Sequence, residues 1–94
     1  MKKNIKIGII GLGYWGPNLV RNFLTTKNCD VSYVCDTNIK ILKKFSKNNP
    51  NINTVTDYKS FLSHVDAVAI ATPVGTHYDI GLECLKKGKH VFIE

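Results

Sequence analysis

The sequence predicts an α/β fold built on a doubly wound parallel sheet with the strand order 3-2-1-4-5. Two observations and one rule of topology lead to this prediction. Segments rich in β-branched residues alternate with amphipathic segments along the whole chain, which is the pattern of repeated strand and helix units. Residues 67–71 form a continuous apolar run, as in a parallel strand covered on both faces. Right-handed crossovers between such strands give the doubly wound arrangement.

Five strands are expected from their apolar, β-branched composition and from the turn residues that bound them. They cover residues 5–10, 31–35, 53–55, 67–71 and 90–93. The third strand carries the weakest signal, and the fifth is still in progress where the sequence stops.

The first two helices are expected in the intervals between the first three strands. One begins at Trp15, where Pro17 is tolerated because the N–H groups of a first turn have no partner inside the helix. Asp36 and Thr37 are suitable residues to cap the second helix, which ends before Pro50. Its lysines share one side, which predicts a solvated face; they are Lys40, Lys43, Lys44 and Lys47.

Two further helices are expected in the second half of the chain. A short one covers residues 57–62, and a longer one follows Thr76, which with Asp79 forms an approximate capping box. Gly88 marks its end. One broad apolar side is expected to face the sheet; its residues are Ile80, Leu82, Cys84 and Leu85.

The composition indicates one small domain, residues 1–94. The chain has 44% hydrophobic residues and a formal net charge of +6, which is ordinary globular usage. Its three cysteines lack the spacing of a zinc site or a disulfide framework, so no metal is expected. A basic start and an apolar stretch faintly resemble a secretory signal, but Lys6 interrupts the run. No stretch approaches the roughly 20 apolar residues of a membrane span, and a reducing, cytoplasmic setting is the expectation.

A glycine motif follows the first predicted strand. Gly11, Gly13 and Gly16 match the pattern G-x-G-x-x-G between a strand and a helix, and Asp36 lies 20 residues beyond the last glycine. This context is the fingerprint of a dinucleotide site. The first glycine permits the turn, the second admits a pyrophosphate and the third lets helix and sheet pack closely. The start of the helix then binds the phosphates.

Asp36 predicts which dinucleotide is bound. A carboxylate accepts hydrogen bonds from the adenosine ribose hydroxyls, whereas a 2′-phosphate meets like charge. We therefore expect NAD to bind at least roughly 10-fold more tightly than NADP. The alternative is that Asp36 only caps the next helix. Lys40 is in principle able to reach a 2′-phosphate, but it belongs to the solvated lysine face.

The segment 71–77 follows the fourth strand and is expected to face the same crevice. Thr72 and its backbone are candidates for the nicotinamide side. A plain turn leading into a capped helix explains Pro73, Gly75 and Thr76 equally well. His77 fits a packing residue better than a general base.

Three other residues near the motif are candidates for contact with the cofactor. Tyr14 and Trp15 are expected to cover the pyrophosphate turn or to meet a neighbouring domain. Cys35 lies at the end of a strand beside Asp36, where a small buried residue is the simplest interpretation. No pair of nucleophile and base is recognisable, so no catalytic residue is expected within this chain.

Taken together, residues 9–16, Asp36, the segment 71–77 and residues 88–94 resemble the glucose-fructose oxidoreductase / inositol dehydrogenase (Gfo/Idh/MocA) family. The resemblance covers essentially the whole chain. Residues 13–23 look most like sugar-nucleotide members such as UDP-N-acetylglucosamine 3-dehydrogenases.

The resemblance implies a Rossmann domain that binds NAD and is followed by a substrate domain that also forms oligomer contacts. It implies a Glu-Lys-Pro motif whose glutamate matches Glu94, so the chain is expected to be a fragment that stops before the catalytic lysine. Cofactor contacts are implied for Gly11, Gly13, Gly16, Asp36, Thr72, Pro73, His77 and Glu94. The implied reaction is hydride transfer between nicotinamide and a hydroxyl carbon of a sugar, sugar nucleotide or cyclitol. The expected partners are that small molecule and further copies of the chain, without nucleic acid or membrane.

Two alternatives remain open from the sequence. One is a stand-alone module that responds to NAD; its basic charge would then favour nucleic acid, although the lysines are dispersed and no recognition motif accompanies them. The other is the cofactor half of a homoserine or dihydrodipicolinate type dehydrogenase.

Overall fold

The computed structural model describes residues 4–13 and 16–93. Its sheet is parallel throughout and has the predicted order β3-β2-β1-β4-β5. The strands are β1 Ile5–Ile10, β2 Cys29–Cys35, β3 Asn53–Val55, β4 Ala67–Ile70 and β5 His90–Ile93. The α-helices are α1 Gly16–Thr25, α2 Ile39–Asn48 and α3 His77–Lys86, and the 3-10 helices are η1 Tyr58–Ser60, η2 Leu62–His64 and η3 Val74–Thr76.

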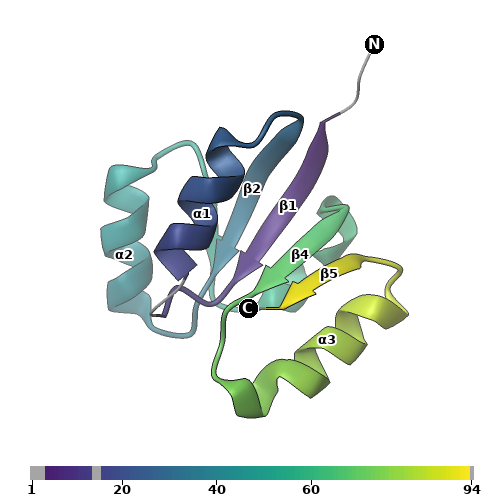
Figure 1. The fold of residues 1–94 in the computed structure, drawn as a ribbon. Helices are drawn as coiled ribbons and strands as arrows, with labels where there is room; N and C mark the ends of the chain where they lie inside the picture. The colour runs from purple at the N-terminus through teal and green to yellow at the C-terminus, as the bar shows by residue number, and fades with distance from the viewer. Residues whose placement is uncertain (1–3, 14–15, 94) are drawn as a thin grey trace.

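The sheet is covered on both faces, as the apolar composition of its central strands requires. Figure 1 shows α1 and α2 on one side of the sheet and α3 on the other. One core cluster lies under α1 and α2, and includes Ile9, Val34 and Leu42. The second lies under α3, η1 and η2, and includes Phe61 and Cys84.

The central strand β1 carries a glycine, Gly8, where it meets Phe61, the residue between η1 and η2. A Cβ atom on Gly8 would lie 2.9 Å from Cζ of Phe61 and would contact Cε1 of the same ring even more closely. Phe61 is fully buried and stacks on Tyr33 of β2, with 5.2 Å between the ring centroids. Gly8 therefore lets this large side chain lie directly against the sheet.

The predicted cap of α2 was wrong, whereas Thr76 occupies the predicted N-cap position of α3 but its side chain does not cap the helix. Asn38 caps α2 by accepting hydrogen bonds from the amides of Lys40 and Ile41. Asp36 does not cap the helix, because its carboxylate accepts from the amides of Leu12 and Asn38. Thr76 makes no capping bond to α3; η3 precedes that helix directly, and the Thr76 hydroxyl instead reaches Thr72 and the Pro73 carbonyl.

Three other boundaries or faces differ from the prediction. The strand β2 starts at Cys29, earlier than expected, because it pairs with β1 from Ile5 onward. The short helix expected over residues 57–62 is two 3-10 turns, η1 and η2. Leu82 and Leu85 of α3 are exposed, because Gly81 and Cys84 form the side of the helix that faces the sheet. Within the described ranges, no helix is long and apolar enough to cross a membrane.

Candidate functional site

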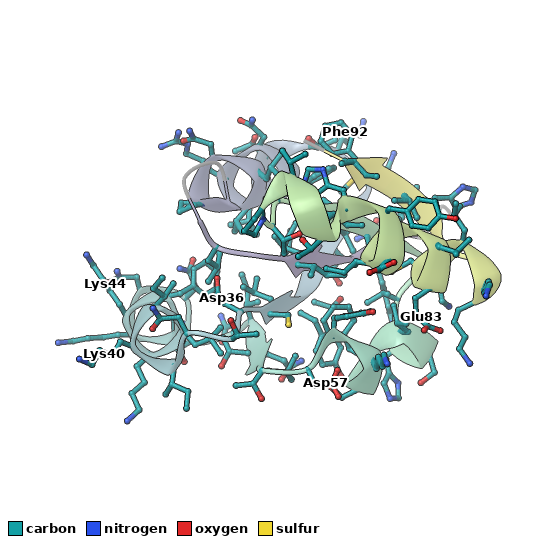
Figure 2. All side chains as sticks on the ribbon, turned by 90° about the horizontal axis from the view of Figure 1, so that it is seen from below. Asp36, Lys40, Lys44, Asp57, Glu83 and Phe92 are labelled. Carbon is teal, nitrogen blue, oxygen red and sulfur yellow. The ribbon has the colours of Figure 1, made fainter. Side chains whose placement is uncertain are left out.

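A cleft of about 340 Å³ lies at the carboxyl ends of the strands, where ligands bind in open α/β sheets. Figure 2 views this side of the molecule. The glycine turn and the segment after β4 line part of the cleft, and the ends of β2 and β3 line the rest. The lining residues are Ile10, Gly11, Gly13, Cys35, Asp36, Thr37, Thr56, Asp57, Tyr58, Ala71, Thr72, Pro73 and Ile80.

Gly11 forms the sharp turn after β1. Its φ angle is +99°, and a Cβ atom there would lie 2.8 Å from the carbonyl carbon of Ala71 and 2.9 Å from Cγ2 of Thr72. Its amide donates to the carbonyl of Cys35, 2.8 Å away. Both the backbone angle and the packing therefore require glycine at this position.

Gly13 is different, because the chain itself leaves room beside it. Among the described residues, a Cβ atom on Gly13 would meet only the carbonyl oxygen of Ala71, at 3.8 Å, which is an ordinary van der Waals contact. The part of the chain that the structure describes therefore does not explain the glycine. A pyrophosphate approaching the backbone at the start of α1 does explain it, so the turn fits a dinucleotide.

Asp36 links the end of β2 to the glycine turn. Its Oδ2 accepts from the amide of Leu12 at 2.8 Å, and its Oδ1 accepts from the amide of Asn38 at 2.8 Å. A carboxylate has about four acceptor positions, so each oxygen keeps acceptor capacity for the cleft that Asp36 lines. The carboxylate of Asp36 thus lines the candidate site and does not cap α2.

The thiol of Cys35 adjoins Asp36 in the cleft. Burial raises the pKa of this thiol to about 12, with smaller contributions from the negative charges of Asp36 and Asp57. A neutral thiol is a poor nucleophile. Cys35 therefore serves as a small apolar wall, as predicted.

The segment after β4 is held by its own hydrogen bonds. A ring nitrogen of His77, Nε2, lies 2.7 Å from the carbonyl oxygen of Thr72. The Thr76 hydroxyl lies 2.7 Å from both the Thr72 hydroxyl and the Pro73 carbonyl. These bonds fix Thr72 and Pro73 along one side of the cleft.

Most of the predicted site residues that the structure describes come together. Gly11, Gly13, Asp36, Thr72 and Pro73 all line the cleft. Gly16 begins α1. His77 is half-buried and turns back to the Thr72 carbonyl; it is not among the lining residues. Tyr14, Trp15 and Glu94 lie outside the described residues.

Sequence reasoning missed one side of the cleft, which follows β2 and β3 and includes α3. The missed residues are Thr37, Thr56, Asp57, Tyr58 and Ile80. A signal was present, because Thr56 and Asp57 come directly after a predicted strand, and the carboxyl ends of parallel strands share one edge of the sheet. Lys40 and Lys44, in contrast, are exposed and extend from α2 away from the sheet (Figure 2).

The cleft at the carboxyl ends of the strands is distinguished from the other hollows of the surface by the residues that line it, and not by its volume. A larger hollow of about 550 Å³ lies between α1 and α2, and its walls include Val20, Leu24 and Phe45. Of the residues that the structure describes in the glycine turn, this hollow touches only Leu12. Among the residues that the structure describes, no group of three or more His, Cys, Asp or Glu side chains is placed to hold a metal ion.

A glycine turn that opens a helix, with an acidic residue at the end of the adjacent strand, defines a dinucleotide-binding domain. Comparison with known proteins names the family. The model of the oxidoreductase family GFO_IDH_MocA, described as an NAD-binding Rossmann fold, matches residues 5–94. The chain therefore belongs to this family, whose Rossmann domain has NAD as its cofactor, and the resemblance seen in the sequence is confirmed.

Similar proteins are considerably longer than this chain. A protein of Shewanella baltica called glycosyl hydrolase family 109 protein is 30% identical over 101 residues, covering 96% of this chain and 22% of that protein. The scyllo-inositol dehydrogenase of Lactobacillus casei, solved with NAD(H) and scyllo-inositol, is 31% identical with a TM-score of 0.86, covering 97% of this chain and 28% of that one. The dehydrogenase WlbA of Bordetella pertussis, solved with NADH and UDP-GlcNAcA, shares the fold with a TM-score of 0.87 at 23% identity, again covering 97% and 28%.

Proposed function

We propose that this chain is the NAD-binding portion of an oxidoreductase that moves hydride between nicotinamide and a hydroxyl carbon of a sugar, sugar nucleotide or cyclitol. The observation that carries the cofactor part is Asp36, whose carboxylate joins the glycine turn to the end of β2 and lines the cleft. The substrate class is supported by the similarity to the inositol dehydrogenase. The cofactor carries the redox chemistry, and this chain supplies its position and electrostatic environment.

The preference for NAD over NADP follows from charge. Asp36 offers acceptors to the ribose hydroxyls and repels a 2′-phosphate. Asp57 lines the same cleft and adds a second negative charge there. We therefore propose that both carboxylates disfavour NADP.

Calorimetry on the 94-residue chain tests this proposal. NAD should bind at least roughly 10-fold more tightly than NADP, and Asp36→Ala should weaken NAD binding far more than NADP binding. Asp30→Ala is a matched control, because Asp30 is exposed on β2 and does not line the cleft. Equal affinity of the unmodified chain for the two dinucleotides would refute the role given to Asp36.

We further propose that the chain alone does not turn over substrate, because hydride transfer needs substrate-binding and proton-transfer groups, which we expect in a separate substrate domain. A panel of sugars, sugar nucleotides and inositols with NAD would show no NADH formation by the isolated chain. Robust turnover would contradict this part of the proposal and leave the cofactor assignment unaffected.

A second candidate activity is NAD-assisted cleavage of glycosides. It is favoured by the relatives called glycosyl hydrolase family 109 proteins, since some glycosidases use NAD in place of the usual carboxylate pair. The two candidates differ in product when the domain is assayed joined to a substrate domain. Net NADH formation supports the dehydrogenase, whereas release of the aglycone without net NADH supports the glycosidase.

A further inference from the structure

The segment after β4 contains a chain of hydrogen bonds whose proton positions follow from chemistry. A carbonyl oxygen only accepts, so His77 Nε2, 2.7 Å from the Thr72 carbonyl, carries a proton and donates it. In its neutral form His77 is therefore the tautomer protonated at Nε2.

The same argument fixes the directions of the hydrogen bonds made by the hydroxyls of Thr72 and Thr76. The Thr76 hydroxyl has one proton and lies 2.7 Å from the Pro73 carbonyl, which only accepts, so that proton is donated to Pro73. The Thr72 hydroxyl, also 2.7 Å from the Thr76 oxygen, must then supply the proton between the two hydroxyls. Because the Thr72 hydroxyl donates its one proton to Thr76, Thr72 Oγ1 can only accept a hydrogen bond from any other partner.

The place of Thr72 limits which part of a dinucleotide this oxygen meets. Thr72 lines the cleft and lies beside the glycine turn, since a Cβ atom on Gly11 would come within 2.9 Å of its Cγ2. Asp36 is at the end of β2, on the opposite side of β1 from β4. If Asp36 holds the adenosine ribose and the turn holds the pyrophosphate, Thr72 is on the side of the nicotinamide nucleoside. Phosphate oxygens only accept, so they are not partners for this acceptor.

We propose that Thr72 Oγ1 accepts a hydrogen bond from the nicotinamide nucleoside of bound NAD, and that His77 and Thr76 are positioning residues that hold Thr72 in that state. This inference rests on the proposed function, because it requires that NAD binds. It gives His77 a role without direct contact: the imidazole fixes the Thr72 backbone, and the Thr76 hydroxyl fixes the direction of the Thr72 proton.

Binding measurements with NAD, ADP-ribose and ADP test the proposal on the 94-residue chain. Thr72→Val removes the acceptor and should weaken NAD roughly 3- to 10-fold while leaving ADP unchanged, because ADP lacks the whole nicotinamide nucleoside. Thr72→Ser keeps the hydroxyl and should retain most of the affinity. A loss that includes ADP-ribose identifies a ribose hydroxyl as the donor, and a loss confined to NAD identifies the carboxamide; both support the proposal.

His77 is tested by a matched pair of variants. His77→Phe removes the donor and should reproduce the loss for NAD with ADP unchanged, whereas His77→Gln places an amide N–H in reach of the Thr72 carbonyl and should restore binding. His90→Gln is the control, because His90 is exposed on β5. Circular dichroism of each variant establishes that it is folded. Equal losses for NAD and ADP, or no loss for NAD, would overturn the inference.

A measurement on the unmodified chain does not depend on any variant. The ¹⁵N chemical shifts of the His77 ring at neutral or higher pH should show the proton on Nε2. A proton on Nδ1 would overturn the positioning role of His77. Failure of the unmodified chain to bind either NAD or ADP would instead overturn the proposed function, and the inference with it.

Discussion

Two glycines of the same motif are required for different physical reasons. At Gly11 the backbone has a positive φ angle and the neighbouring segment leaves no space for a side chain. At Gly13 a Cβ atom would meet only one oxygen of the described residues, at 3.8 Å. The first glycine is therefore a requirement of the fold, and we propose that the second is a requirement of the bound dinucleotide.

Gly13→Ala separates these two requirements. We expect the melting temperature to change by no more than a few degrees, since alanine fits the space left by the chain, while affinity for NAD falls at least roughly 10-fold because the methyl group occupies the approach of the pyrophosphate. Thermal unfolding and calorimetry measure the two effects. Gly75→Ala is the control, because a Cβ atom there meets nothing within 4 Å and Gly75 does not line the cleft. Unchanged NAD affinity in Gly13→Ala would show that the turn does not hold the pyrophosphate.

At the scale of the secondary-structure elements, β1 packs closely against the junction of η1 and η2 at a single position, Gly8. The ring of Phe61 occupies the space that a side chain on Gly8 would need, and its other contacts, including Tyr33, leave it fully buried. Phe61, between the two 3-10 turns after β3, thus covers the centre of the sheet.

Gly8→Ala tests this packing. The added methyl group forces the buried ring to move, which costs about 1–3 kcal/mol of unfolding free energy, as measured by denaturant titration. Phe61→Leu is itself destabilising, but the double variant Gly8→Ala with Phe61→Leu should be more stable than the sum of the two single effects predicts, because leucine vacates part of the space. Strict additivity would mean that Gly8 and Phe61 do not compete for the same volume.

The elements also show how far sequence reasoning extends. The order of the sheet was predictable, because alternating strands and helices with right-handed crossovers leave few topologies. The cap of α2 was not, since Asp36, Thr37 and Asn38 are all good caps and only the position of Leu12 shows that Asp36 is engaged by the glycine turn. Likewise, spacing along the chain located Asp36, but the contribution of Thr56 and Asp57 depends on how β3 is placed beside β2.

At the scale of the whole molecule, the core on the α3 side depends on neutral thiols. Cys35 and Cys84 are buried in the same cluster, one at the end of β2 and one on α3. Burial raises the pKa of Cys35 from 9.0 to about 12 and that of Cys84 to about 11. Burial also raises the pKa of Tyr58, which packs against the same cluster.

These shifts predict the pH dependence of stability on the alkaline side. A thiol whose pKa is higher in the folded than in the unfolded state binds its proton more tightly when folded, so its stabilisation is complete below pH 9 and is lost as the pH rises toward 11 for Cys84 and 12 for Cys35. Each thiol contributes a slope of up to about 1.4 kcal/mol per pH unit in its window. Urea titrations of the reduced chain at pH 8, 9, 10 and 11 should show an unfolding free energy that declines above pH 9.

The cysteine variants isolate the thiols from other groups that titrate in this range. Cys35→Ala and Cys84→Ala lower stability at every pH by leaving a small cavity, but each should reduce the alkaline slope. Cys29→Ala is the control, because Cys29 is only half-buried, and it should retain the slope of the unmodified chain. If all three variants decline in parallel with the unmodified chain, thiol ionisation does not limit the stability of this domain, and the alkaline loss belongs to other groups, such as Tyr58, whose pKa is also raised by burial.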